Sequence, residues 1–195
     1  MKSFPNSRTE IMKLATDLVA FLRAEMEDKQ GRPEWTRQNY DLLDRFFRSE
    51  YCDECRFAGS ANGGEFLWDF AGHRGYNGML ITAESEHDTD PAAIAEDFDR
   101  LLYGISPLKL MICRIEKRFS TVPLAQEEAE RIRIRVHENL QQNSVQYCSG
   151  AVFVVYCTWW AAEGKNRDFA YFLQIDGEPN CASVRRDQQF ELFPG

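Results

Sequence analysis

The chain has 195 residues, of which 44% are hydrophobic and 28% are charged, and this composition suits one ordinary globular domain. A formal charge of −8 argues against a dedicated binder of the phosphate backbone, although it leaves room for local basic strips in an enzyme that releases its substrate. The first ten residues lack the apolar stretch of a secretory signal, and no run reaches the roughly 18 apolar residues of a membrane span, so we expect a cytoplasmic protein without membrane contact.

Two helices are expected before any strand. Apolar residues recur at helical spacing over residues 7–28, and Gly31 and Pro33 end this pattern. A second helical pattern covers residues 34–51, and a short strand is expected at 56–60. The N-terminal part of the chain is therefore predicted to be mostly helical.

The next segment changes to the alternating pattern of a β-hairpin. Its first arm covers residues 64–71, with Trp68 and Phe70 on one face, and its second arm covers residues 78–86. The dipeptide Asn77-Gly78 lies between the arms and favours a type I′ turn, because such a turn needs positive φ at both central residues. The sequence thus predicts a hairpin with a two-residue loop.

Helices and strands alternate after the hairpin. A helix is expected from Asp90-Pro91 to Gly104, and the remaining elements are strands at 107–115, 151–160 and 168–175 and a helix at 124–142. The first two of these strands are apolar on both faces, as central strands are. The order of elements predicts an α/β fold with a mixed central β-sheet flanked by helices.

The six cysteines do not form an obvious metal site. They are Cys52, Cys55, Cys113, Cys148, Cys157 and Cys181. Two of them, Cys113 and Cys157, lie in apolar runs and are expected to be buried thiols. The Cys52–Cys55 pair lacks the second pair of ligands that a structural zinc site needs, and it follows a helix instead of opening one as a redox motif does, so both roles are disfavoured.

Three carboxylates converge on one face of the predicted hairpin. With a two-residue loop at Asn77-Gly78, Asp69 lies opposite Glu86, Ala71 lies opposite Glu84, and the three acidic side chains share a face. Clustered carboxylates repel one another unless a cation or a proton compensates, and a hard divalent ion such as Mg²⁺ prefers oxygen ligands. The alternative is that these are ordinary acidic residues on an exposed sheet face, and a slip of one residue would place Asp69 on the other face.

The order of elements, with the acidic residues of the segments FLWDF and TAESE, resembles the PD-(D/E)XK nuclease superfamily, also called the restriction-endonuclease-like fold. That core runs helix, three antiparallel strands, helix, strand (αβββαβ), and residues 34–115 supply this order here. The resemblance implies one domain, with residues 1–33 as an extra N-terminal helix and residues 116–195 as a C-terminal αββ extension of the same sheet.

The same resemblance implies a set of site residues. Asp69 and Glu84 match the family's metal-binding acids, and Glu86 stands where the family usually has lysine, a departure that some active restriction enzymes share. Lys109, in the segment SPLKLMI, is a candidate for the displaced lysine, and its plainer interpretation is a strand-entry lysine with its amine in solvent.

Two functions follow from the resemblance. The first is a metal-dependent nuclease that hydrolyses phosphodiester bonds of nucleic acid, with Mg²⁺ or Mn²⁺ held by Asp69, Glu84 and Glu86 and with Lys109 or His87 assisting. The alternative is a catalytically inactive relative that acts as a binding or regulatory module with a protein partner or as a homodimer. No Ser-His-Asp, P-loop or GxGxxG pattern points to another chemistry.

Overall fold

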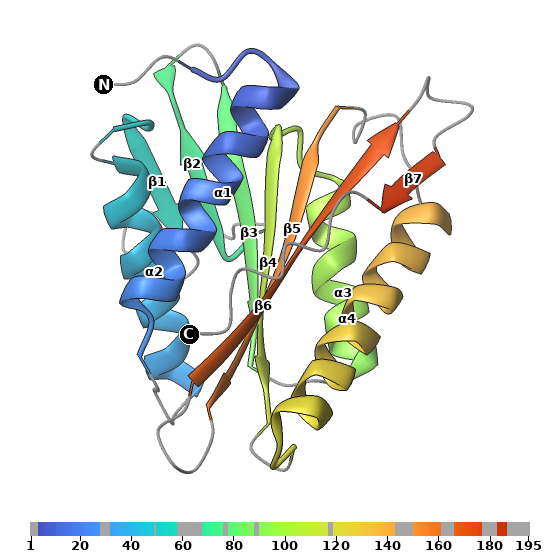
Figure 1. Cartoon of the computed structure of the whole chain (residues 1–195). Helices are drawn as coiled ribbons and strands as arrows, with labels where there is room; N and C mark the ends of the chain where they lie inside the picture. The colour runs from blue at the N-terminus through green and yellow to red at the C-terminus, as the bar shows by residue number, and fades with distance from the viewer. Residues whose placement is uncertain are drawn as a thin grey trace.

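The computed structural model describes residues 4–27, 32–48, 50–57, 68–75, 78–87, 90–116, 119–142, 150–160, 166–176 and 183–186. Over these residues the protein has an α/β fold, in which a seven-stranded mixed sheet is flanked by four helices (Figure 1). The elements in chain order are α1 (Arg8–Glu25), α2 (Arg32–Arg48), β1 (Glu54–Phe57), β2 (Phe70–His73), β3 (Met79–Glu86), α3 (Pro91–Leu102), β4 (Leu108–Ile115), α4 (Val122–Gln142), β5 (Val152–Trp160), β6 (Asn166–Asp176) and β7 (Ser183–Arg186).

The strands lie in the sheet in the same order as in the chain, from β1 to β7. Antiparallel pairing joins β1, β2 and β3, parallel pairing joins β3, β4 and β5, and antiparallel pairing resumes with β6 and β7. The two parallel connections run through α3 and α4. Because such crossovers share one handedness and both advance in the same direction, the two helices fall on the same face of the sheet.

The sheet is the middle of three layers (Figure 1). Helices α1 and α2 pack on one face with their own hydrophobic core, and α3 and α4 pack on the other with a second core. Strand β4 contributes to both cores, with Leu110 and Ile112 on the α1–α2 side and Met111 and Cys113 on the α3–α4 side. The expectation that this strand is central and apolar on both faces is confirmed.

The predicted register of the hairpin is wrong by two residues. Phe70 pairs with Ala83 and Ala71 pairs with Thr82, whereas a two-residue loop would have placed Ala71 opposite Glu84. A shift by two leaves Phe70, Ala71 and Gly72 on the same faces as in the predicted register, since the side-chain period of a strand is two. Glu84 and Glu86 therefore keep their common face, whereas Asp69 precedes β2 and lies beside Glu84 instead of Glu86.

The cause of the shift is a longer turn and a bulge. The Arg74 N–H donates to the Gly78 carbonyl at 3.0 Å, and the pairing of β2 with β3 is irregular between Gly72 and His73. Gly78 has the expected positive φ, at 85°, and Gly75 also has a positive φ of 43°, which glycine tolerates without strain. Asn77 lies outside the described residues.

Three smaller expectations also change. Strand β1 begins two residues earlier than predicted, and residues 58–60 lie outside the described part of the chain, as do residues 64–67 of the first hairpin arm. Trp68 and Phe70 do not share a face: Trp68 packs with the α3–α4 core and Phe70 with the α1–α2 core, because the strand begins only at Phe70. The predicted C-terminal αββ extension has a third strand, the short strand β7.

None of the described helices combines the length and apolar character needed to cross a lipid bilayer.

Candidate functional site

Glu84 and Glu86 lie near the C-terminal end of β3, on the face covered by α3 and α4. Their neighbours Ile81 and Ala83 belong to the core on the opposite face, so the alternation of the strand sends both glutamates toward α3. Glu84 is 1% exposed and Glu86 is 3% exposed. These two carboxylates are therefore buried, which excludes the interpretation of ordinary acidic residues on an exposed sheet face.

Asp69 lies just before β2, beside Glu84. Its Oδ2 accepts a hydrogen bond of 2.9 Å from the Ser85 backbone N–H, and the carboxyl also accepts one from the Tyr40 hydroxyl. Burial raises the pKa of Asp69, and these two hydrogen bonds act in the opposite direction. Asp69 is thus fixed to β3 and α2, although the predicted partner across the hairpin was Glu86.

Helix α3 adds two residues that the sequence analysis did not select, Asp97 and Arg100. Asp97 is hydrogen-bonded to Glu86, and Arg100 Nη1 lies 3.0 Å from Asp97 Oδ1. The Trp68 Nε1–H donates to the Arg100 carbonyl at 2.7 Å, which ties the segment before Asp69 to the same turn of α3. The site therefore draws on β3, α3 and the segment before β2.

A sequence signal for Asp97 was present but weak. Its position is three residues after Ile94 and four before Leu101, both of which are buried, so it lies on the core-facing stripe of the helix. An acidic residue on the apolar stripe of a helix is expected to be a buried carboxylate, and this helix directly follows the strand that carries the two glutamates. The assignment, however, needs the knowledge that α3 packs directly on β3.

Burial dominates the electrostatics of the site. It raises the pKa of Glu84 to about 10, with further increases from the charges of Asp69 and Asp97 and an opposing effect from Arg100. Burial, together with the hydrogen bond and the charge of Glu86, raises the pKa of Asp97 to about 7. Glu84 therefore carries a proton at neutral pH when no cation is bound.

One carboxylate oxygen of the site has no hydrogen-bond partner. Glu84 Oε1 is buried and receives no donor in the structure. Buried polar atoms are normally satisfied, so an unsatisfied carboxylate oxygen beside a second carboxylate is a position that a cation would fill. The atoms that Asp69 and Glu84 offer as metal ligands are all carboxylate oxygens, which suit a hard divalent ion.

The described residues do not contain three or more His, Cys, Asp or Glu side chains already gathered around one point. Mg²⁺ commonly binds through one or two carboxylates and completes its coordination with water and substrate oxygens. The pair formed by Asp69 and Glu84 is therefore the part of the predicted ligand set that fits best, and the carboxylate of Glu86 is engaged with Asp97.

Lys109 is buried, so the expectation that its amine lies in solvent is wrong. It is 0% exposed, and its amine donates to the carbonyl of Leu101 at 2.5 Å and to the carbonyl of Gly104, at the C-terminal end of α3. The amine also lies 5.6 Å from the centroid of the Phe153 ring. The last carbonyls of a helix have no partner within the helix, and a lysine on the strand beneath can satisfy them.

His87 follows Glu86 but belongs to the opposite layer. Its Nε2 lies 2.9 Å from Arg114 Nη1, and its ring packs edge-on against Trp35 of α2, with 5.7 Å between the ring centroids. Because adjacent residues of a strand point to opposite faces, the position next to Glu86 does not bring His87 to the carboxylates.

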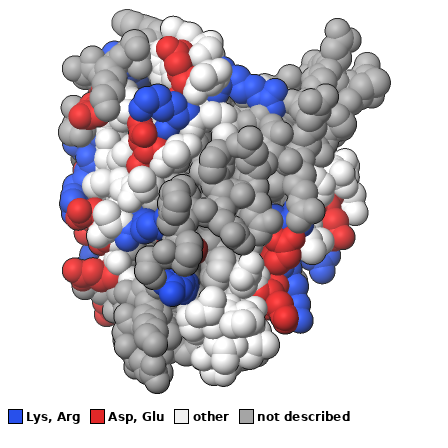
Figure 2. Space-filling model, viewed as in Figure 1, with Lys and Arg blue, Asp and Glu red and all other residues white. Residues whose placement is uncertain are grey.

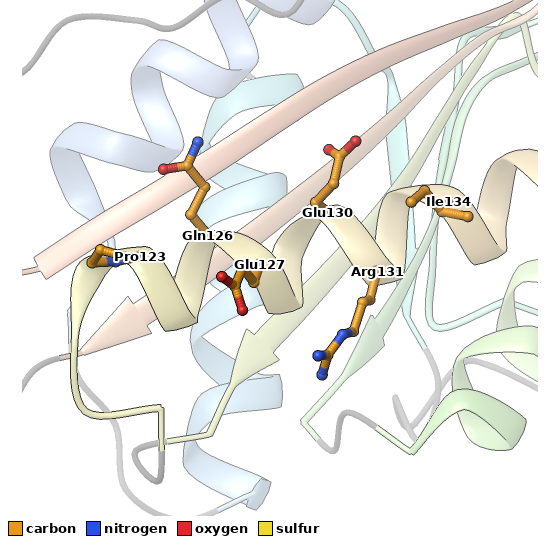
Figure 3. Close-up of a pocket in the computed structure, with 6 residues that line it drawn as sticks. All are labelled: Pro123, Gln126, Glu127, Glu130, Arg131 and Ile134. Atoms are coloured by element: carbon orange, nitrogen blue, oxygen red, sulfur yellow. The ribbon is translucent and has the colours of Figure 1, made fainter.

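A separate hollow lies on the outer surface of α4. Its volume is about 510 Å³, and the close-up in Figure 3 shows the six residues that line it, which are Pro123, Gln126, Glu127, Glu130, Arg131 and Ile134. All six belong to α4 and none is part of the carboxylate site. A shallow surface of this kind, with two acidic residues and one basic residue, carries no arrangement for catalysis.

Figure 2 shows the charged side chains of the described residues on one face of the molecule. On the face drawn in Figure 2, Lys and Arg side chains are scattered among Asp and Glu and do not form one continuous basic area. This distribution agrees with the formal charge of −8 and favours brief contacts with a polyanion over strong, sequence-independent binding.

Comparison with protein-family models and with curated proteins identifies no relative of this chain. No protein-family model matches the chain, and no curated protein matches its sequence.

Proposed function

We propose that the protein is a metal-dependent, nuclease-like hydrolase that cleaves phosphodiester bonds of nucleic acid. The observation that carries the proposal is the buried carboxylate of Glu84, whose Oε1 lacks a hydrogen-bond partner and which lies next to Asp69. The order α2, three antiparallel strands, α3 and a parallel β4 supports it, because the nuclease core described from the sequence has the same order.

In this proposal Asp69 and Glu84 hold a divalent cation, Mg²⁺ or Mn²⁺, and Glu86 completes the acidic set. When bound, such a cation would supply an activated water molecule and would offset the charge that develops on a phosphate group. The Ser85 N–H and the Tyr40 hydroxyl fix the orientation of Asp69, and burial under α3 keeps bulk water away from Glu84. Lys109 remains a candidate catalytic residue from the family pattern, although its bonds to two carbonyls favour a structural role.

The test combines cation binding with cleavage. Wild-type protein is titrated with Mn²⁺ by calorimetry and is incubated with DNA and RNA in Mg²⁺ or Mn²⁺, beside Asp69→Asn and the exposed control Asp41→Asn on α2. We expect binding and cleavage by the wild type and by the control, and loss of both in Asp69→Asn. A wild type that neither binds Mn²⁺ nor cleaves, or an Asp69→Asn variant as active as the wild type, would refute the proposal.

A specific observation favours the alternative of a binding or regulatory protein. Glu86, Asp97 and Arg100 form a connected set, in which a proton and a guanidinium offset part of the negative charge without a metal. Under this alternative the protein acts through a protein partner or as a homodimer. Size-exclusion chromatography with light scattering and a pulldown would then find a stable assembly, whereas cleavage that depends on Asp69 would exclude it.

A further inference from the structure

The proposed site lacks the positive charge that the nuclease pattern normally supplies. The third motif position is Glu86, and the amine of Lys109 is bonded to carbonyls at the end of α3. The carboxyl groups of Asp69 and Glu84, with Glu86 and Asp97 nearby, repel one another when ionised and also repel a phosphate group, and one bound cation offsets only part of this negative charge. A second positive group beside the carboxylates would reduce this repulsion further.

Among the residues that the structure describes, Arg100 is the basic residue whose charge acts on both Asp69 and Glu84. Burial has the largest effect on the pKa of both Asp69 and Glu84 and raises it, and the charge of Arg100 acts in the opposite direction on each. Its guanidinium is held by Asp97 on one side, at 3.0 Å, and by Glu96 on the other, at 2.8 Å. It lies at the rim of the site.

The two partners of Arg100 differ in their exposure. The side chain of Asp97 is 14% exposed and that of Glu96 is 72% exposed, whereas that of Arg100 is 40% exposed. The guanidinium therefore stands between buried carboxylates and solvent, anchored firmly only on its inner side. An exposed ion pair such as the one with Glu96 is weak, so a stronger anion can replace it.

We infer that Arg100 contacts the phosphate group of the substrate and supplies the positive charge that the third motif position lacks. The inference rests on the proposed function and names a residue of the same site. Arginine suits this task because its planar guanidinium presents several N–H donors that match phosphate oxygens. Asp97 keeps the guanidinium at the rim, while the phosphate takes the place of Glu96.

Two affinities separate this inference from the proposed function. The first is the affinity for Mn²⁺, measured by calorimetry, and the second is the affinity for a fluorescein-labelled DNA duplex and for the matching RNA, measured by anisotropy in Ca²⁺ to prevent cleavage. The variants are Arg100→Ala, Arg100→Gln, which removes the charge but keeps hydrogen-bonding capacity toward Asp97, and Arg100→Lys. The matched control is Glu96→Gln, which removes the exposed partner of the same arginine.

We expect the affinity for the oligonucleotides and the affinity for Mn²⁺ to respond differently to the loss of Arg100. Loss of Arg100 weakens the binding of the oligonucleotides by about tenfold or more, as removal of a charged hydrogen bond does, whereas Mn²⁺ affinity is kept or increases because a positive charge has left the acidic site. Arg100→Lys recovers part of the oligonucleotide affinity, and Glu96→Gln keeps both affinities at least at the wild-type level.

Failure of the two proposals is also distinguishable. A wild type without Mn²⁺ binding and without cleavage refutes the proposed function, and this inference falls with it. If the wild type binds both ligands and Arg100→Gln or Arg100→Ala retains the full oligonucleotide affinity, the inference alone is overturned. If Arg100→Ala does not fold, the comparison between Arg100→Gln and Arg100→Lys decides, and equal affinity of these two variants overturns it.

Discussion

Replacement of Glu84 by glutamine is expected to stabilise the protein in the absence of divalent cations. The folded protein holds Glu84 protonated up to a pKa of about 10, because the carboxyl is buried next to Asp69 and Asp97, whereas the carboxyl of the unfolded chain ionises near its ordinary value of 4.5. Over this pH interval the folded state binds more protons than the unfolded state. The contribution of Glu84 to the free energy of unfolding therefore decreases as the pH rises from about 4.5 to about 10.

The size of the effect follows from the same values. Each pH unit between the two pKa values costs about 1.4 kcal/mol, so the cost is below about 1 kcal/mol at pH 5 and about 3 kcal/mol at pH 7. Glutamine has nearly the same shape and cannot ionise, so Glu84→Gln removes this cost. The variant should be more stable than the wild type by about 2–3 kcal/mol at pH 7 and nearly equal to it at pH 5.

The assay is urea unfolding at pH 5, 6, 7 and 8 in EDTA, followed by circular dichroism, with the exposed Glu127→Gln as the matched control. Asp97 and Asp69 also titrate in the wild type, so the difference between Glu84→Gln and the wild type is the informative quantity. Mn²⁺ should stabilise the wild type and the control but not Glu84→Gln. If Glu84→Gln gains no stability relative to the wild type between pH 5 and pH 8, Glu84 is not held protonated and the reasoning is refuted.

Three other predictions concern the packing of the fold. Gly72→Ala should lower the free energy of unfolding by about 1–3 kcal/mol in urea melts, because the new Cβ would lie 2.9 Å from Cys52 Sγ; a variant of unchanged stability would show that this contact relaxes freely. Lys109→Met should cost about 1–3 kcal/mol, since two carbonyls at the end of α3 lose their donor, and an unchanged urea midpoint would contradict the structural role. The four buried thiols, which are Cys52, Cys55, Cys113 and Cys157, should react with a thiol reagent only on unfolding, and fast labelling of the native protein at any of them, located by mass spectrometry, would contradict this.

The sequence alone was sufficient for the architecture because the signals were local. Helical spacing in α1 and α4, apolar runs in β4 and β5, and the Asp90-Pro91 helix start each depend on residues close together in the chain. Their order then predicted a mixed sheet flanked by helices, which is confirmed. The short strand β7 was missed because an isolated four-residue strand has too few positions to show a period.

The faces of Glu84 and Glu86 were also determined by the sequence, since the alternation of a strand does not depend on its partner. The residue that lies across the hairpin from Asp69 was not determined by the sequence. The loop length and the bulge at Gly72 set the register, and neither follows from a single Asn-Gly signal. Asp69 consequently lies by Glu84 instead of Glu86.

Only the tertiary structure decided which residues complete the site. Asp97 and Arg100 follow the glutamates by 11 to 16 residues along the chain, and they meet them because the crossover from β3 to β4 lays α3 on β3. The packing of α3 also explains why Lys109, predicted to be exposed to solvent, is buried. Its amine donates to carbonyls at the C-terminal end of α3. The sequence thus determined that Glu84 and Glu86 share one face of β3, and the docking of α3 on that strand determined their burial, their protonation and their neighbours.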